Sequence, residues 1–226
     1  MEENEVKQEQ VVNTEELKNE TVGAVKQVKD TIKNVNVKEE AKAAKGFIIE
    51  MIKNPLEKIK EIANDSTNTY FKTAIVLVII WTLVSLIGTI SFDYFSWNRF
   101  GKILLRYVKV ILAPVISLVI MSLIIFVMNK KSKKSLVTVL TTVTTIKLPL
   151  IVAKVISLLT LISSNASVIT SRVSSLCSVI TTVLFFFAIR ELFNEEDEKQ
   201  VLKNYVIIEA IYLVASLVIS YLGIYM

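Results

Sequence analysis

Apolar residues in this chain gather into long runs beyond residue 70, whereas the first 70 residues are mostly polar and charged. Crossing the hydrocarbon core of a bilayer takes about 20 apolar residues in a helix. Five segments come close to that length. They predict an all-α fold, a polytopic bundle of transmembrane helices within residues 71–226. The predicted spans are 71–90, 110–128, 136–162, 173–189 and 205–225.

The third predicted span is unusual because Lys147, Pro149 and Lys154 interrupt it. Two separate spans are excluded on length, since only about 11 apolar residues precede Lys147, far short of a crossing. We therefore predict one tilted, kinked helix. In that helix Pro149 frees a backbone carbonyl, which nearby threonines would satisfy.

Two segments precede the spans. Residues 1–45 are rich in Glu, Lys, Gln and Asn, and we expect a charged tail that is largely disordered. Residues 46–65 repeat apolar positions with helical period among lysines, which predicts an interfacial amphipathic helix divided at Pro55. Its apolar face would lie in lipid or against the spans. Apolar positions at helical spacing within the tail leave open a short coiled coil or a transient solvated helix: Val22, Val25, Val28, Ile32 and Val35.

Basic residues near the ends of the spans predict the orientation. Counting Lys and Arg gives 11 on one side and 5 on the other. This excess predicts a multi-pass protein of the cell membrane, with its amino terminus cytoplasmic and its carboxyl terminus outside. The loop between the second and third spans is the densest basic cluster, which either favours anionic lipid headgroups or only determines topology. The cluster consists of Lys130, Lys131, Lys133 and Lys134.

The composition argues against an enzyme. The chain has no His and a single Cys, Cys177. His is the commonest general base and transition-metal ligand, and a lone thiolate holds no structural zinc. The five glycines form no phosphate-binding loop. We therefore predict a non-enzymatic protein without a metal or a cofactor.

Charged residues inside the predicted spans are the candidates for function, because an ionised group in hydrocarbon is costly. They are Lys147, Lys154 and Glu209. Side chains tilt towards the amino terminus of their helix, so Lys147 leans towards the depth of Glu209. This predicts an interhelical Lys147–Glu209 pair that acts as a registry clamp or in an ion relay. Lys154 follows two helical turns later, on the same face as Lys147.

Hydroxyl side chains crowd the third and fourth predicted spans. Small and hydroxylic residues let transmembrane helices approach closely and hydrogen-bond across their interface. The pattern therefore predicts close helix packing, with a polar conduit for a substrate as the alternative. The residues are Thr138, Thr141, Thr142, Thr144 and Thr145 in the third span and Ser174, Ser175, Ser178, Thr181 and Thr182 in the fourth.

The order of these features is similar to that of a known family. A polar region leads to Asn54-Pro55-Leu56-Glu57 and an amphipathic stretch, the third span contains Lys147-Leu148-Pro149-Leu150, and a fifth span closes the chain. Over about residues 47–226 this resembles the YIP-domain family, named for its interaction with Ypt/Rab GTPases, in its uncharacterised bacterial branch. The resemblance implies five spans and a cytoplasmic amino terminus. The trafficking role of eukaryotic members is not carried over, because a bacterium has no Rab partner.

Two functions follow as hypotheses. The first is a membrane scaffold or adaptor whose partners are the lipid bilayer, anionic headgroups, a second copy or another membrane protein, and not nucleic acid. The alternative is a small transporter or permease subunit that uses polar groups in the third to fifth spans. Many secondary transporters are built from repeated halves, and this chain shows no repeat, although a homodimer would compensate.

Overall fold

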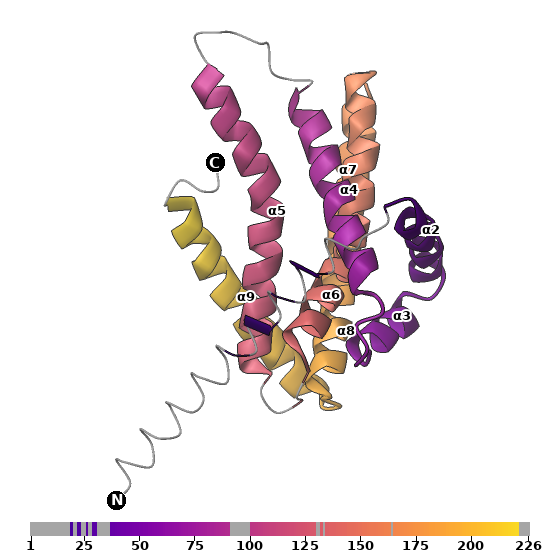
Figure 1. Cartoon of the computed structure of the whole chain (residues 1–226), viewed down its shortest axis with the longest axis vertical. Coiled ribbons are helices and arrows are strands. Elements are labelled where there is room, and N and C mark those ends of the chain that lie inside the picture. Colours follow the sequence, from indigo (N-terminus) through magenta and orange to yellow (C-terminus); the bar gives the residue numbers. More distant parts are fainter. Residues whose placement is uncertain are drawn as a thin grey trace, which may run out of the picture.

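The computed structural model describes residues 37–90, 100–129, 132, 134–163 and 165–221, with a few single positions before residue 31. Every regular element in these ranges is helical, which confirms the all-α prediction (Figure 1). Of the residues predicted to form a helical face in the tail, only Val22 is described, so the coiled-coil hypothesis lies outside the described residues. The elements are α2 (Val37–Lys53), α3 (Pro55–Ala63), α4 (Phe71–Ile90), α5 (Phe100–Met128), α6 (Leu136–Ile146), α7 (Leu148–Ser157), the 3₁₀ helix η3 (Leu158–Leu161), α8 (Ala166–Phe193) and α9 (Glu198–Tyr221).

Four helices, α4, α5, α8 and α9, are each long and apolar enough to cross a membrane. A fifth crossing arises if α6 and α7–η3, which are bent by 40° relative to each other, form one broken span. Figure 1 supports that assignment, because α6 lies near the lower end of the bundle while α7 rises beside α4, and α8 descends again. The chain is therefore a multi-pass membrane protein, and the kink predicted in the third span is present.

Several helices extend beyond the predicted spans. Helix α5 begins at Phe100 rather than near residue 110, α8 begins at Ala166 rather than near 173, and α9 begins at Glu198 rather than near 205. The backbone hydrogen bonds of a helix continue wherever the sequence allows, whereas the predicted limits followed only the apolar run. The bundle thus carries helical ends that are more polar than its spans.

The predicted amphipathic segment is a helical elbow. Pro55 is the first residue of α3 and follows the end of α2 at Lys53, which confirms the break expected there. Both helices pack against the bundle, α2 on α4 and α3 on α6 and α8. Of the two arrangements left open for the apolar face, contact with the spans is therefore observed. The buried face consists of Ala44, Phe47, Met51, Ile59, Ile62 and Ala63.

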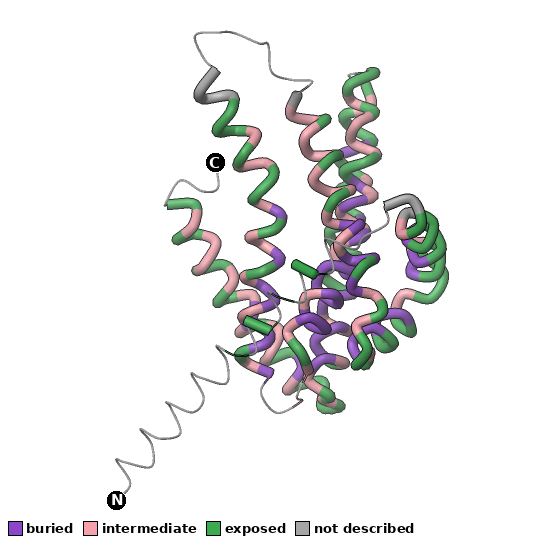
Figure 2. The backbone as a smooth tube through the Cα atoms, viewed as in Figure 1, coloured by how far each residue is buried: buried purple, intermediate pink, exposed green. Residues whose placement is uncertain are grey.

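Buried residues concentrate at one end of the bundle, where α3 and α6 meet the adjoining ends of α4, α5 and α8 (Figure 2). We call this the α3 end. Away from it the helices expose apolar side chains, as expected for surfaces that face lipid. Helix α9 is the extreme case, since Val201 and Ile208 are its buried residues.

The five-crossing arrangement predicts which loops share a side of the membrane. In a variant whose buried Cys177 is replaced by Ala, we expect single cysteines at Asn64 and Glu196 to react with an impermeant maleimide from one side. A cysteine at Asn165, in the turn before α8, should react only from the opposite side. Labelling of position 165 from the same side as position 64 would show that α6 and α7 re-enter instead of crossing.

Candidate functional site

Lys147 lies at the break in the third span. It is the C-cap of α6 and precedes α7, in which Pro149 occupies the first turn. A proline lacks a backbone N–H and its ring disfavours a helical conformation in the residue before it, so the ladder of hydrogen bonds is interrupted here. The Lys147 carbonyl accepts a hydrogen bond from the Ile151 N–H at 3.1 Å and restarts the helix. The charged side chain therefore sits where two helical segments meet.

Glu209 on α9 is an electrostatic neighbour of Lys147. Each charge lies within the attractive field of the other. In the described part of the chain, however, no nitrogen–oxygen distance of 4.0 Å or less joins the two side chains. The two side chains are therefore neighbours that form no direct ion pair, and their pairing stays a prediction. Lys154, predicted to share the face of Lys147, is exposed on α7 and does not join this pair.

The threonines of α6 are buried, and three of them bond within their own helix, whereas the Thr138 hydroxyl lies within hydrogen-bond distance of Ser135 Oγ, the Asp65 carbonyl and Asn68 Oδ1. The hydroxyls of Thr141, Thr142 and Thr145 donate to the carbonyls of the residues four positions earlier, at 2.8 to 2.9 Å. Thr144 is also buried. A hydroxyl bonded in this way presents mainly its methyl group to a neighbouring helix. The geometry fits the packing interpretation of these residues rather than a polar conduit.

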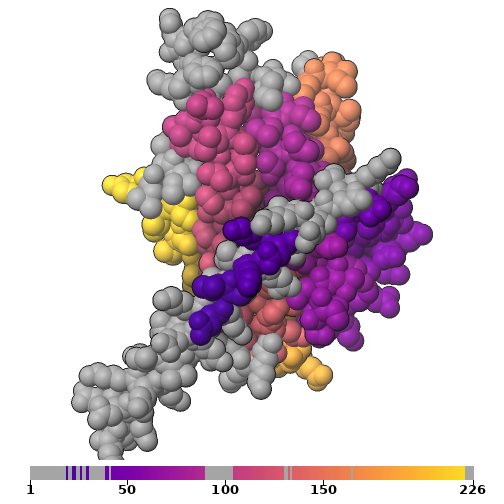
Figure 3. Space-filling model, in the orientation of Figure 1, coloured from indigo at the N-terminus to yellow at the C-terminus, as the bar shows by residue number. Residues whose placement is uncertain are grey.

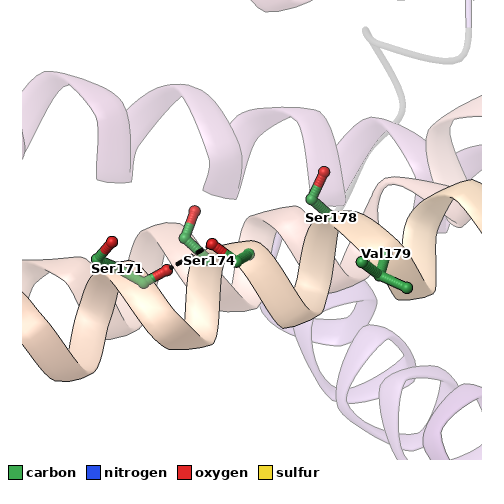
Figure 4. Close-up of a pocket in the computed structure, with 5 residues that line it drawn as sticks. Ser171, Ser174, Ser178 and Val179 are labelled. Atoms are coloured by element: carbon green, nitrogen blue, oxygen red, sulfur yellow. Dashed lines mark hydrogen bonds between the residues drawn. The ribbon is translucent and has the colours of Figure 1, made fainter.

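Most hydroxyls of α8 point away from the bundle. Ser174, Ser175, Ser178 and Thr182 are exposed, and only Thr181 of the predicted set is buried, where it donates to the Cys177 carbonyl at 2.8 Å. The expectation that these serines pack between spans three and four is therefore wrong for this face of α8. They border a shallow, open hollow (Figure 4), in which Ser175 donates to the Ser171 carbonyl.

Lys134 is the described lysine of the predicted basic cluster, and it lies near Glu191 at the end of α8. Lys130, Lys131 and Lys133 are outside the described residues. The Nζ of Lys134 donates to Asn64 Oδ1 at 2.7 Å. Burial lowers the pKa of Lys134, and the nearby charge of Glu191 opposes that shift. Acidic residues gather from the last turn of α8 to the first residue of α9: Glu191, Glu195, Glu196, Asp197 and Glu198.

The buried side-chain amide of Asn129 joins the end of α5 to the end of α8. Asn129, at the end of α5, is 5% exposed and donates from Nδ2 to the Leu192 carbonyl at 2.8 Å. That carbonyl belongs to the last turn of α8, where helical partners are lacking. The bond therefore caps α8 from α5 and fixes the end of α8 beside the end of α5.

Lys58 on α3 is the most extensively bonded charge in the described part of the chain. Its side chain is 10% exposed, and its Nζ lies 2.8 Å from Glu50 Oε2 on α2 and 2.9 Å from Glu61 Oε2. The same nitrogen lies 3.1 Å from the Tyr70 hydroxyl and 4.5 Å from the centre of the Tyr70 ring. Phe47 covers another side at 5.7 Å. We call this arrangement the Lys58 cage.

The Lys58 cage favours the charged forms of Lys58 and Glu61 and the neutral form of Tyr70. Burial disfavours the ammonium, but hydrogen bonds to Glu50, Glu61 and Tyr70 outweigh it and raise the pKa of Lys58. Hydrogen bonds from Tyr70 and Lys58 lower the pKa of Glu61. Burial and the bond to Glu61 raise the pKa of Tyr70. The cage therefore joins α2, α3 and the approach to α4 across the range in which Lys58 is cationic and Glu61 anionic.

The Lys58 cage is not predicted by the sequence pattern. Lys58 was counted as one of several lysines in an amphipathic segment, and its partners come from three separate elements. The available signal was the spacing of Lys58 and Glu61, which places them on one face of a helix.

Comparisons of the chain with protein-family models, curated proteins and solved structures find no match. The site is therefore argued from its own geometry.

Replacing Lys58 by Met keeps much of the apolar stem but removes the cation from the cage. We expect the α2–α3 elbow to open more easily by about 1–3 kcal/mol, because Glu50, Glu61 and Tyr70 lose their hydrogen bonds to a buried ammonium. Hydrogen exchange of the α3 amides in nanodiscs measures this. Lys60→Met, at an exposed position on the same helix, is the matched control and should leave exchange unchanged. Equal exchange in the two variants would contradict a role for the cage.

The attraction between Lys147 and Glu209 gives a second prediction. Lys147→Glu places two carboxylates near each other within the spans, and we expect it to reduce the amount of protein recovered from membranes. Adding Glu209→Lys should restore that amount, because opposite charges face each other again. Glu209→Lys should not rescue Lys154→Glu, since Lys154 lies elsewhere on the surface. Failure of the first rescue would show that the two residues do not act as a pair.

Proposed function

We propose that this chain is a non-enzymatic membrane scaffold or adaptor, which acts through lipid or protein contacts at the α3 end of the bundle. The observation that carries the proposal is the Lys58 cage, which holds α2 and α3 against the spans. A helical elbow fixed in this way is a rigid platform beside the membrane, and rigid elements present contact surfaces at low entropic cost.

The polar groups inside the spans support the same proposal. The hydroxyls of Thr141, Thr142 and Thr145 are bonded to their own backbone, which favours a role in helix packing. The surface that remains for interaction is the exposed apolar face of α5, α8 and α9 and the charged connections at the α3 end. The resemblance to the YIP-domain family, as a proposal, leads to the same class of non-enzymatic five-span protein.

Transport is the second candidate because of one observation. Lys147 lies at a 40° break in a span, near Glu209. Broken helices in transporters place charged or polar groups at the substrate site. A transporter built on this break would require Lys147 for flux.

Purified protein in sealed liposomes separates the two candidates. We expect vesicles that contain the protein to hold potassium and proton gradients as long as protein-free vesicles do, and selected lipids to remain bound through purification. Flux that Lys147→Ala abolishes, and that Lys154→Ala leaves unchanged, would overturn the scaffold proposal in favour of transport. Lys154 is the matched control because it belongs to the same broken span but is exposed.

A further inference from the structure

The face of α2 that points away from the bundle is both basic and apolar. Ala44, Phe47 and Met51 are buried against the bundle. At about 100° per residue, the opposite side of the helix carries a different set of residues. Ile52 is 68% exposed, Ile49 is 44% exposed and, just beyond on α3, Leu56 is 46% exposed. Three exposed lysines lie on the same outward side: Lys42, Lys45 and Lys53.

Contacts of α2 place it at the level where the first span begins. Glu40 Oε1 lies 3.7 Å from Lys72 Nζ, in the first turn of α4. The rings of Phe47 and Tyr70 are 5.8 Å apart between their centres. Helix α2 therefore lies beside the end of α4, at the boundary of the membrane-spanning segment, and not out in the aqueous phase.

The direction of α2 also suits a membrane boundary. In Figure 1 α2 is seen close to end-on, whereas α4 and α5 run along the long axis of the molecule. Its axis thus lies across the spans, roughly along the plane of a bilayer. In Figure 3 the purple surface of α2 and α3 projects from the side of the bundle near the α3 end. An outward face in this position meets the headgroup region.

The charges of α2 determine which occupant fits this face. Glu50 is held by Lys58 and Glu40 by Lys72. No described acidic group pairs with Lys42, Lys45 or Lys53. By contrast, Lys134 of the basic loop already bonds to Asn64 and lies near Glu191. The three lysines of the outward face therefore have no acidic partner at ion-pair distance among the described residues.

We propose that the outward face of α2 lies in the headgroup region of the bilayer that the spans cross and binds anionic lipid there. Ile49, Ile52 and Leu56 enter the boundary with the acyl chains, and the three lysines contact lipid phosphates. Interfacial helices combine apolar insertion and electrostatic attraction in this way. The inference rests on the proposed function and names the lipid class for one of its surfaces.

Spin labels test the position of this face. Single cysteines at Ile49 and Ile52, in the Cys177→Ala protein in nanodiscs, are labelled and exposed to oxygen, which enters lipid, and to a nickel chelate, which stays in water. Leu213, 59% exposed on α9, gives the lipid reference, and Glu196 in the α8–α9 connection gives the aqueous one. We expect the labels at 49 and 52 to show an oxygen accessibility between those of the two references and a nickel accessibility well below that of the label at 196. Labels that behave like the one at 196 would overturn the proposal.

Lipid composition supplies the second measurement. The spin labels at positions 49 and 52 should lie deeper in nanodiscs that contain phosphatidylglycerol than in purely zwitterionic nanodiscs. Changing Lys42, Lys45 or Lys53 to Gln should each weaken this preference for anionic lipid about fivefold. Lys60→Gln, on α3, is the control. Equal depth in both lipids, or coupling between labels on two copies of the chain, would overturn the proposal. These outcomes would not contradict the scaffold proposal, because only Lys147-dependent flux in the liposome experiment would overturn that proposal.

Discussion

The absence of water from the hydrocarbon core is the constraint on which this structure depends. Each backbone N–H and C=O in that region needs a partner inside the protein, and a continuous helix supplies it. Side-chain hydroxyls obey the same demand, as Thr141, Thr142 and Thr145 show by donating to their own helix. Where Pro149 interrupts the ladder, the chain bends and the next helix restarts from the Lys147 carbonyl. The broken third span is a consequence of this rule.

At the α3 end, polar side chains join helices and connections that lie outside the hydrocarbon core. Lys58 connects two short helices to the approach of the first span, and Asn129 caps α8 from the end of α5. Each of these side chains is largely buried, so the loss of one partner would leave a polar group unsatisfied. Apolar burial concentrates at the same end. The molecule thus combines a firmly packed base with spans that diverge from it.

The architecture was readable from the sequence where one physical signal acts alone. Apolar length predicted the spans, and Pro55 and Pro149 marked the two breaks, because a proline lacks a backbone donor and clashes with the preceding turn. Pro114, by contrast, lies inside α5 without ending it. Helix limits at Phe100, Ala166 and Glu198 were missed because the polar ends continue the helices without an apolar signal. The direction of the α8 serines was missed because it depends on the rotation of that helix against its neighbours. The Lys58 cage needs Glu50, Glu61 and Tyr70 in three-dimensional register, which a linear pattern does not contain.

The sparse attachment of α9 has a consequence for the bilayers that the protein tolerates. Val201 and Ile208 anchor its first half, and a 2.5 Å hydrogen bond between Tyr212 and Ser117 of α5 is placed just beyond them. The remaining two to three turns, through Leu217 and Tyr221, are exposed around most of their circumference. A span held at one end adjusts its tilt when the thickness of the hydrocarbon changes, at a small cost for each ångström of mismatch. Thickness differences between membranes would therefore be absorbed by α9, leaving the packing around α3 and α6 undisturbed.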